Sequence, residues 1–160
     1  MRTISAYQPS DLGIIAEFVS AIREYERAAV PELKPGHEIA QSYAEQLVRL
    51  TSERMGCIFL AKTKARPIGF ICAWIDEDDD PLLREETRSH AYVSDLFVDE
   101  AWRRKGVASH LLGAAENEMR LRGCKRIRIC SKAANTAAIG CYGRAGFQAY
   151  EVIFTKSLAE

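Results

Sequence analysis

The 160-residue sequence lacks the features that mark several classes of protein. It has no C-x-x-C pair, and its five cysteines are odd in number and mostly in apolar surroundings, which argues against a disulfide framework and against a metal site. Lysine plus arginine and aspartate plus glutamate both number 22, so the basic excess typical of nucleic-acid binders is absent. The P-loop pattern G-x-x-x-x-G-K-[ST] does not occur, which disfavours a nucleotide enzyme of that kind.

Long apolar runs are also missing. No stretch is long and apolar enough to span a bilayer, and the first residues lack the apolar core of a signal peptide. We therefore expect a cytoplasmic protein that binds neither membranes nor nucleic acid. The composition, with 48% hydrophobic and 28% charged residues, is that of a globular protein, and no repeat or linker divides the chain. We expect one domain over residues 1–160, with a core from about residue 2 to residue 158.

Hydrophobic periodicity predicts a mixed α/β order of elements. The expected strands are Arg2–Tyr7, Cys57–Lys62, Ile68–Ile75, Tyr92–Val98 and Lys125–Ser131. The expected helices are Leu12–Arg27, His37–Arg54, Val107–Arg122 and a short one from about Ala134 to Gly143. Phe147–Leu158 is expected to form one long strand or a final hairpin, which brings the sheet to about six or seven strands.

The most informative stretch runs from the strand Tyr92–Val98 through a basic loop into a helix that begins near Val107. The loop carries three consecutive cations and then Gly106, whose lack of a side chain allows a backbone or a ligand to come close. Unpaired N–H groups and the positive end of the dipole at a helix start favour an anion. The pattern indicates a phosphate or pyrophosphate site, and the alternative is an ordinary solvated loop.

A second group of residues lies on the last predicted helix. Asn135, Ala138 and Tyr142 stand at i, i+3 and i+7, so they share one helical face. An amide and a phenol on one face can line a cleft. The alternative is a packed helix whose tyrosine reaches a backbone partner.

These two groups of residues carry a resemblance to a known family. Arg103-x-x-Gly106-x-Ala108 is similar to the R/Q-x-x-G-x-G/A motif of the GCN5-related N-acetyltransferase (GNAT) family, and Leu96-Phe97-Val98 resembles its bulged fourth strand. Asn135-x-x-Ala138-x-x-x-Tyr142-x-x-x-Gly146-Phe147 resembles its closing signature. The resemblance covers nearly the whole chain. It implies a GNAT-like α/β (α+β) fold with a mixed, mostly antiparallel central sheet and helices on both faces.

The resemblance also implies acetyl-CoA as cosubstrate and no metal. The strand before the basic loop would splay from its neighbour, and the pantetheine arm would lie in the gap. Backbone N–H groups after Arg103 would hold the pyrophosphate. The residues that would bind the coenzyme are Leu96, Phe97, Val98, Arg103, Arg104, Lys105, Gly106, Val107, Ala108, Ser109 and Asn135.

The reaction implied is direct transfer of an acetyl group to an amine. Tyr142 would be the general acid that protonates the leaving thiolate, and a backbone N–H near Val98 would stabilise the oxyanion. Where the family often has a strand glutamate, Asp95 is the only carboxylate here. It is the candidate base, directly or through water, although strand alternation can turn it away. An acid of Asp76–Asp80 is the other alternative.

Three matters stay open at this stage. The acceptor amine is unidentified, and the acidic run Asp76–Asp80 is compatible with a cationic acceptor and equally with a solvated loop. The oligomeric state is open, with a homodimer as one alternative. A non-catalytic acyl-CoA-binding sensor is the alternative to an enzyme.

Overall fold

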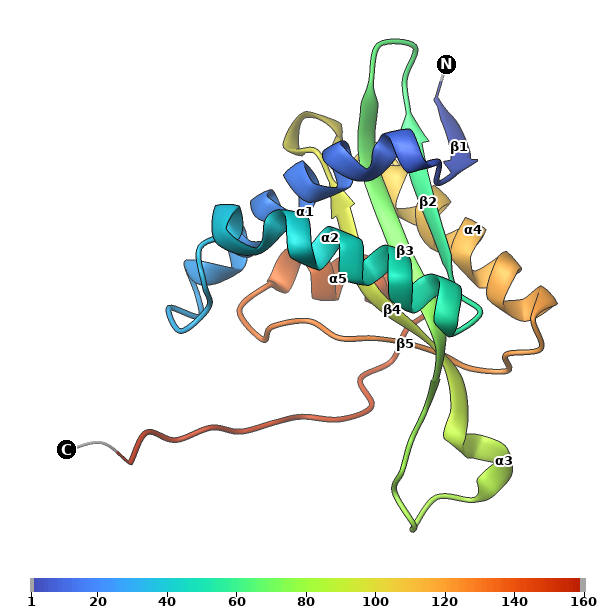
Figure 1. Cartoon of the computed structure of the whole chain (residues 1–160). Helices are drawn as coiled ribbons and strands as arrows, with labels where there is room; N and C mark the ends of the chain where they lie inside the picture. The colour runs from blue at the N-terminus through green and yellow to red at the C-terminus, as the bar shows by residue number, and fades with distance from the viewer. Residues whose placement is uncertain (1, 159–160) are drawn as a thin grey trace.

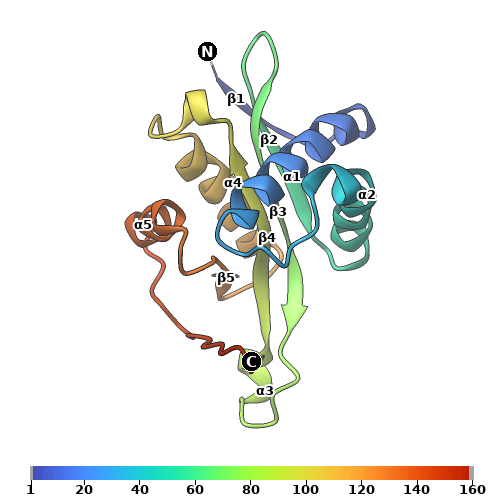
Figure 2. The same ribbon diagram turned by 90° about the vertical axis from the view of Figure 1, so that its left-hand side faces the viewer.

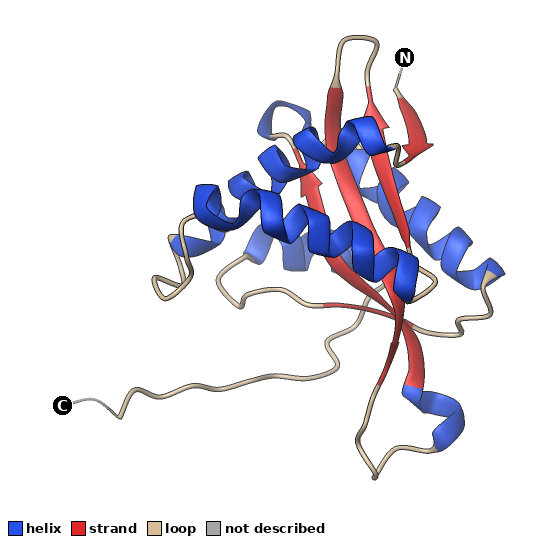
Figure 3. Ribbon diagram, viewed as in Figure 1, coloured by secondary structure: helices blue, strands red, loops and turns tan. Residues whose placement is uncertain are grey.

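The computed structural model describes residues 2–158, and its centre is a twisted five-stranded sheet (Figures 1 and 3). The strands are β1 (Thr3–Ala6), β2 (Cys57–Lys62), β3 (Pro67–Glu77), β4 (Ser89–Val98) and β5 (Ile127–Ile129). They lie side by side in chain order. The first three pairings are antiparallel and the β4–β5 pairing is parallel, so the expected mixed, mostly antiparallel sheet is confirmed.

Helices cover both faces of this sheet, as expected (Figure 2). The main helices are α1 (Leu12–Arg27), α2 (Gly36–Glu53), α4 (Val107–Leu121) and α5 (Thr136–Arg144). The short ones are η1 (Pro9–Asp11), α3 (Glu85–Arg88) and η2 (Glu100–Trp102). The apolar stripes of α1 and α2 pack on one face, and α4 packs on the other together with side chains of α5. The helices α1, α2 and α4 therefore each bury an apolar face against the sheet.

The long strand β3 separates two apolar cores. Its residues alternate between them: Phe70 and Cys72 pack under α1 and α2, whereas Ile71 and Ala73 pack under α4. Because both faces are covered, β3 reads in the sequence as an unbroken apolar run rather than as an alternating strand.

A bulge in β4 decides which way the residues after it point. The register against β3 shifts between the pairs Cys72–Asp95 and Ala73–Val93, so that Ser94 is the extra residue. The bulge reverses the alternation, because Val93 and Leu96 both pack on the α4 side while Asp95 lies on the side of α1 and α2.

The parallel pairing of β4 with β5 stops early. Only residues 91–93 of β4 pair with β5, so one edge of the segment 94–98 has no neighbouring strand in the described part of the chain. The expected splay of the fourth strand is therefore present in the fold. It opens toward the start of α4, which follows β4 after the basic loop.

Two expectations about the last part of the chain were wrong. Phe147–Leu158, expected as a strand or hairpin, has neither helix nor strand, and Figure 1 shows it running away from the sheet in an extended path. The strand expected over Lys125–Ser131 is shortened to β5. The described sheet consequently has five strands rather than six or seven, because alternating apolar residues form a strand only where a partner edge meets them.

Candidate active site

A cavity of about 540 Å³ lies where β4 separates from β5, bounded by the end of α1, the length of α5 and the start of α4. This volume is within the range of small-molecule sites, which is about 300–1,000 Å³. Most of the residues predicted for the site line it: Asp95, Leu96, Phe97, Val98, Arg103, Arg104, Gly106, Val107, Ala108, Ser109, Asn135 and Tyr142. The tertiary structure thus brings the two sequence blocks together around one space.

The start of α4 presents unused hydrogen-bond donors to this cavity. His110 is the first residue whose N–H bonds back along the helix, to Gly106 O at 3.1 Å. The N–H groups of Val107, Ala108 and Ser109 precede it and have no hydrogen-bond partner within residues 2–158, so they are available to a ligand. Gly106 caps the helix at φ 79°, a left-handed conformation that glycine adopts without strain, and Arg104 is also left-handed at φ 57°. These features suit an anion.

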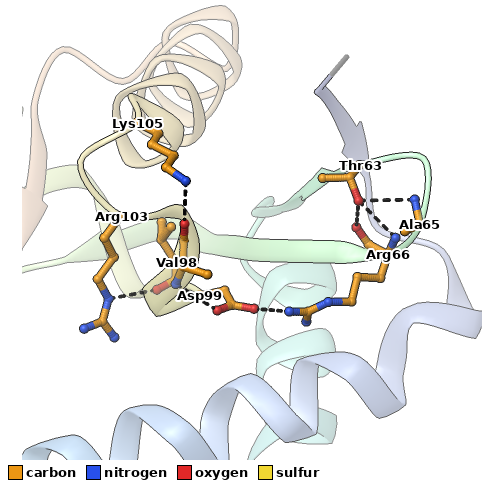
Figure 4. Close-up of polar contacts among 8 residues, drawn as sticks. Thr63, Ala65, Arg66, Val98, Asp99, Arg103 and Lys105 are labelled. Atoms are coloured by element: carbon orange, nitrogen blue, oxygen red, sulfur yellow. Dashed lines mark hydrogen bonds and ion pairs between the residues drawn. The ribbon is translucent and has the colours of Figure 1, made fainter.

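The loop that leads into α4 is held in place by polar contacts (Figure 4). Arg103 Nε donates to Val98 O at 3.1 Å, which ties the loop back to the end of β4. Asp99 accepts from the backbone N–H of Ala101 at 3.3 Å and also pairs with Arg66 from the β2–β3 turn. These contacts fix the path of the loop from the end of β4 to the start of α4.

Lys105 differs from its two basic neighbours. It is not among the residues that line the cavity, because its Nζ donates to Ala101 O at 2.9 Å and lies 5.2 Å from the centre of the Trp102 ring. Arg103 and Arg104 both line the cavity. The coenzyme contact predicted for Lys105 stays a prediction, while the two arginines are the cations of this loop that face the cavity.

The helix α5 places its polar residues as the spacing predicted. Asn135 caps the helix by accepting from Ala138 N at 3.1 Å, so it orders its neighbours while also lining the cavity. Tyr142 lies one turn beyond Ala138, and its ring packs against Phe147 with 6.0 Å between the ring centres. Burial above all, and then nearby negative groups, raises the pKa of Tyr142 to about 12. The phenol therefore keeps its proton at neutral pH.

Residues 19–147 match the Acetyltransferase (GNAT) family, which is about four fifths of the chain. The chain belongs to this family. An uncharacterized N-acetyltransferase of Methanocaldococcus jannaschii is 29% identical over 98 residues, and an acetyltransferase of Agrobacterium fabrum is 42% identical over 66 residues. These alignments cover 59% and 41% of this chain but only 40% and 47% of the relatives, so the chain matches less than half the length of either.

Solved structures of the family share the fold across the full chain. The aminoglycoside N-acetyltransferase AAC(6')-Iy in complex with CoA aligns over 99% of this chain and 96% of its own, with a TM-score of 0.72 and 19% identity. A putative acetyl transferase from Pyrococcus furiosus aligns over 99% and 100%, with a TM-score of 0.73 and 24% identity. At these identities the likeness establishes the fold alone.

Asp95, the carboxylate that the GNAT resemblance suggested as base, is buried in a polar cluster. Its side chain is 2% exposed. Oδ1 accepts from Arg23 Nη2 at 3.2 Å, and Oδ2 accepts from the hydroxyl of Tyr43 at 3.0 Å. Burial raises the pKa of Asp95, against the opposing effects of Arg23, Ser94 and Tyr43. Both oxygens are engaged, which favours a positioning role.

The acidic run Asp76–Asp80 lies away from the cavity and none of its members lines it. Asp76 pairs with Arg54 at 2.7 Å and Asp78 with Arg128 at 2.8 Å, so two of these acids serve local contacts. The hairpin that carries them projects from the sheet beyond the helices (Figure 1). The structure gives no support to a base from this run.

Three residues of the site were missed from the sequence. Arg23, Glu26 and Tyr43 come from α1 and α2, and Arg23 and Glu26 line the cavity beside the end of α1. Arg103 connects this end of α1 with the basic loop before α4, since its guanidinium carbon lies 5.7 Å from the centre of the Tyr25 ring. In the sequence these residues belong to the polar faces of two amphipathic helices, and no motif distinguishes them from ordinary surface residues. The only available signal was a cluster of polar residues at the end of a helix next to a loop.

None of the described helices is both long and apolar enough to cross a membrane.

Proposed function

We propose that the chain is an N-acetyltransferase that moves the acetyl group of acetyl-CoA directly to a primary amine of a small molecule or peptide. The observation that carries the proposal is the coincidence of three features in one cavity: the open edge of β4, the unused N–H groups at the start of α4, and the protonated phenol of Tyr142. A site that only binds an anion would not need the protonated phenol of Tyr142.

The residues present suit a coenzyme A thioester. The N–H groups of Val107, Ala108 and Ser109, with Arg103 and Arg104, would hold the pyrophosphate. The free edge of residues 94–98 would accept the pantetheine arm as an additional strand accepts a peptide. The coenzyme supplies an activated acetyl thioester, and the protein supplies its orientation and its proton donor.

Tyr142 is the proposed general acid. Its raised pKa keeps the proton on the phenol, and the thiolate of the leaving group is the species that needs one. Asp95 would act indirectly, because its carboxylate has both oxygens occupied and almost no exposure. It holds Arg23 at the wall of the cavity.

The acceptor is proposed to be a cationic amine, since the carboxylates of Glu26 and Asp95 line the same cavity as Tyr142 and both contribute to raising its pKa. The whole chain would serve this one activity as a single domain in the cytoplasm. The named activities of the relatives, aminoglycoside acetylation among them, guide the choice of amines to assay.

The protein should be incubated with acetyl-CoA and a panel of amines that includes aminoglycosides, polyamines and peptide N-termini. Release of free thiol that depends on the amine, with an acetylated product identified by mass, would support the proposal. Tight acetyl-CoA binding without turnover of any amine would contradict it and favour an acyl-CoA sensor.

A homodimer is proposed from the chain after α5. Residues Tyr150, Val152, Ile153, Phe154 and Leu158 are between 65% and 90% exposed. The outer edge of β5 has no neighbouring strand among residues 2–158. Pairing of this segment with β5 of a second copy would cover both. Light scattering should give a dimer for the native protein and a monomer for Phe154→Asp, and a native monomer would refute the arrangement.

A further inference from the structure

Glu26 occupies a distinctive place in the cavity. It lies in the last turn of α1 and lines the same space as Tyr142, and its side chain is 19% exposed. Its Oε2 accepts from Arg23 Nη1 at 2.5 Å. Within residues 2–158, its other oxygen, Oε1, has no hydrogen-bond partner. One oxygen is therefore fixed and the other is available to a ligand.

Arg23 joins this carboxylate to the buried one. Its Nη1 contacts Glu26 and its Nη2 contacts Asp95, while its guanidinium carbon lies 4.9 Å from the centre of the Tyr43 ring. Two carboxylates share one guanidinium, so the three side chains together carry one net negative charge. Asp95 is closed off by its two donors, and Glu26 is the member of the cluster that can present this charge to the cavity.

The charge of Glu26 is also felt at the proposed acid. It is one of the groups, after burial and Cys141, that raise the pKa of Tyr142. The two side chains come from helices far apart in the sequence, yet they face one space. An acceptor amine held at Glu26 would therefore lie near the proton donor.

We propose that Glu26 binds the ammonium group of the acceptor and takes its proton, with Arg23 and Asp95 positioning the carboxylate. The inference rests on the proposed acetyltransferase function and deepens it, because it assigns the acceptor to the class of amines that are protonated at neutral pH. It also places the base on a helix rather than on the fourth strand.

The protons balance as follows for an alkylammonium acceptor. Glu26 Oε1 takes one proton from RNH₃⁺ and later releases it to solvent. The neutral amine forms the new C–N bond to the thioester carbonyl, and the C–S bond breaks as the tetrahedral adduct collapses. Tyr142 protonates the leaving thiolate, and the second proton lost by the nitrogen restores the phenol. The sum is RNH₃⁺ plus acetyl-CoA giving the N-acetyl amine, coenzyme A and one proton.

The test compares Glu26→Gln with Glu17→Gln, a control at an exposed position of the same helix. The amide introduced by Glu26→Gln can still accept from Arg23, so the fold should survive, but it can neither take a proton nor pair with a cation. Two acceptors of similar shape separate the roles: ethylamine is a cation at neutral pH, whereas trifluoroethylamine is mostly neutral. We expect kcat/KM for ethylamine to fall about 100-fold or more in Glu26→Gln. For trifluoroethylamine the fall should be several-fold smaller.

Equal losses for the two amines, or an ethylamine rate like that of Glu17→Gln, would overturn the proposal. Calorimetry of ethylamine binding to the complex with coenzyme A gives a readout without turnover, and Glu26→Gln should weaken it at least tenfold. If the native protein turns over no amine but its ethylamine binding is weakened by Glu26→Gln, the binding role of Glu26 is supported and only the acetyltransferase function is refuted. Unchanged binding would overturn the binding role.

Discussion

Replacing Asp95 with asparagine removes the charge at the centre of the cluster formed by Arg23, Tyr43 and Asp95, while the volume of the side chain is kept. The carboxylate is 2% exposed and accepts from Arg23 at 3.2 Å and from Tyr43 at 3.0 Å. The amide of asparagine has one acceptor oxygen, so its NH₂ group must face one of these two donors. A buried donor is then left without an acceptor.

The magnitude follows from the partners that remain. Removing one member of a buried ion pair costs about 3–5 kcal/mol when the other charge is left alone. Arg23 keeps its contact with Glu26 at 2.5 Å, and burial already disfavours the charged form of Asp95, so the loss should lie at the lower end, at about 3 kcal/mol. A chain of this length loses about 2–4 °C in Tm per kcal/mol, which predicts a fall of about 6–12 °C.

Thermal unfolding followed by circular dichroism measures this fall, with Asp79→Asn as a control at an exposed acid of the β3–β4 hairpin. Tyr43→Phe should show a smaller loss, of about 1.5 kcal/mol, because it removes one hydrogen bond to a charged group and leaves no buried charge unpaired. A Tm for Asp95→Asn within about 2 °C of the control would refute the view that Asp95 is a structural anchor. The carboxylate would then be free to act as the base itself.

Three further predictions concern the cavity. Tyr142→Phe should lower kcat about 100-fold or more and leave acetyl-CoA affinity nearly unchanged. Tyr150→Phe, at an exposed tyrosine, is the control, and an unchanged kcat in Tyr142→Phe would show that Tyr142 is not the general acid. Since the pKa of Tyr142 is raised from 10.0 to about 12, the phenol keeps its proton to higher pH, so kcat should show no loss with an apparent pKa near 10; a loss there would contradict the assignment. Gly106→Glu should abolish coenzyme binding measured by calorimetry, because it places a carboxylate beside the free N–H groups of α4; the left-handed φ of 79° adds about 1–2 kcal/mol of backbone strain. Gly113→Glu, within α4, is the control and should bind coenzyme A normally. Normal binding by Gly106→Glu would refute the pyrophosphate site.

The sequence alone determined the parts of the site whose geometry is local. The spacing of Asn135, Ala138 and Tyr142 fixes one helical face whatever surrounds it, and the step from Gly106 into α4 creates unpaired N–H groups through helix geometry itself. The order of strands and helices was also readable, since each element carries its own period of apolar residues.

Only the tertiary structure decided which charged groups meet in the cavity. Arg23, Glu26 and Tyr43 lie 52 to 72 residues from Asp95, and their contacts depend on how α1 and α2 sit on the sheet. The side on which Asp95 emerges depends on the bulge at Ser94, which alternation alone does not reveal.

The segment Phe147–Leu158 illustrates the same limit from the other direction. Its alternating apolar residues favour a strand, but strand formation requires hydrogen bonds from a neighbouring edge, and no strand within residues 2–158 pairs with this segment. Local physics therefore determined the helices and the free N–H groups at the start of α4, whereas long-range packing determined the number of strands and which carboxylates line the cavity.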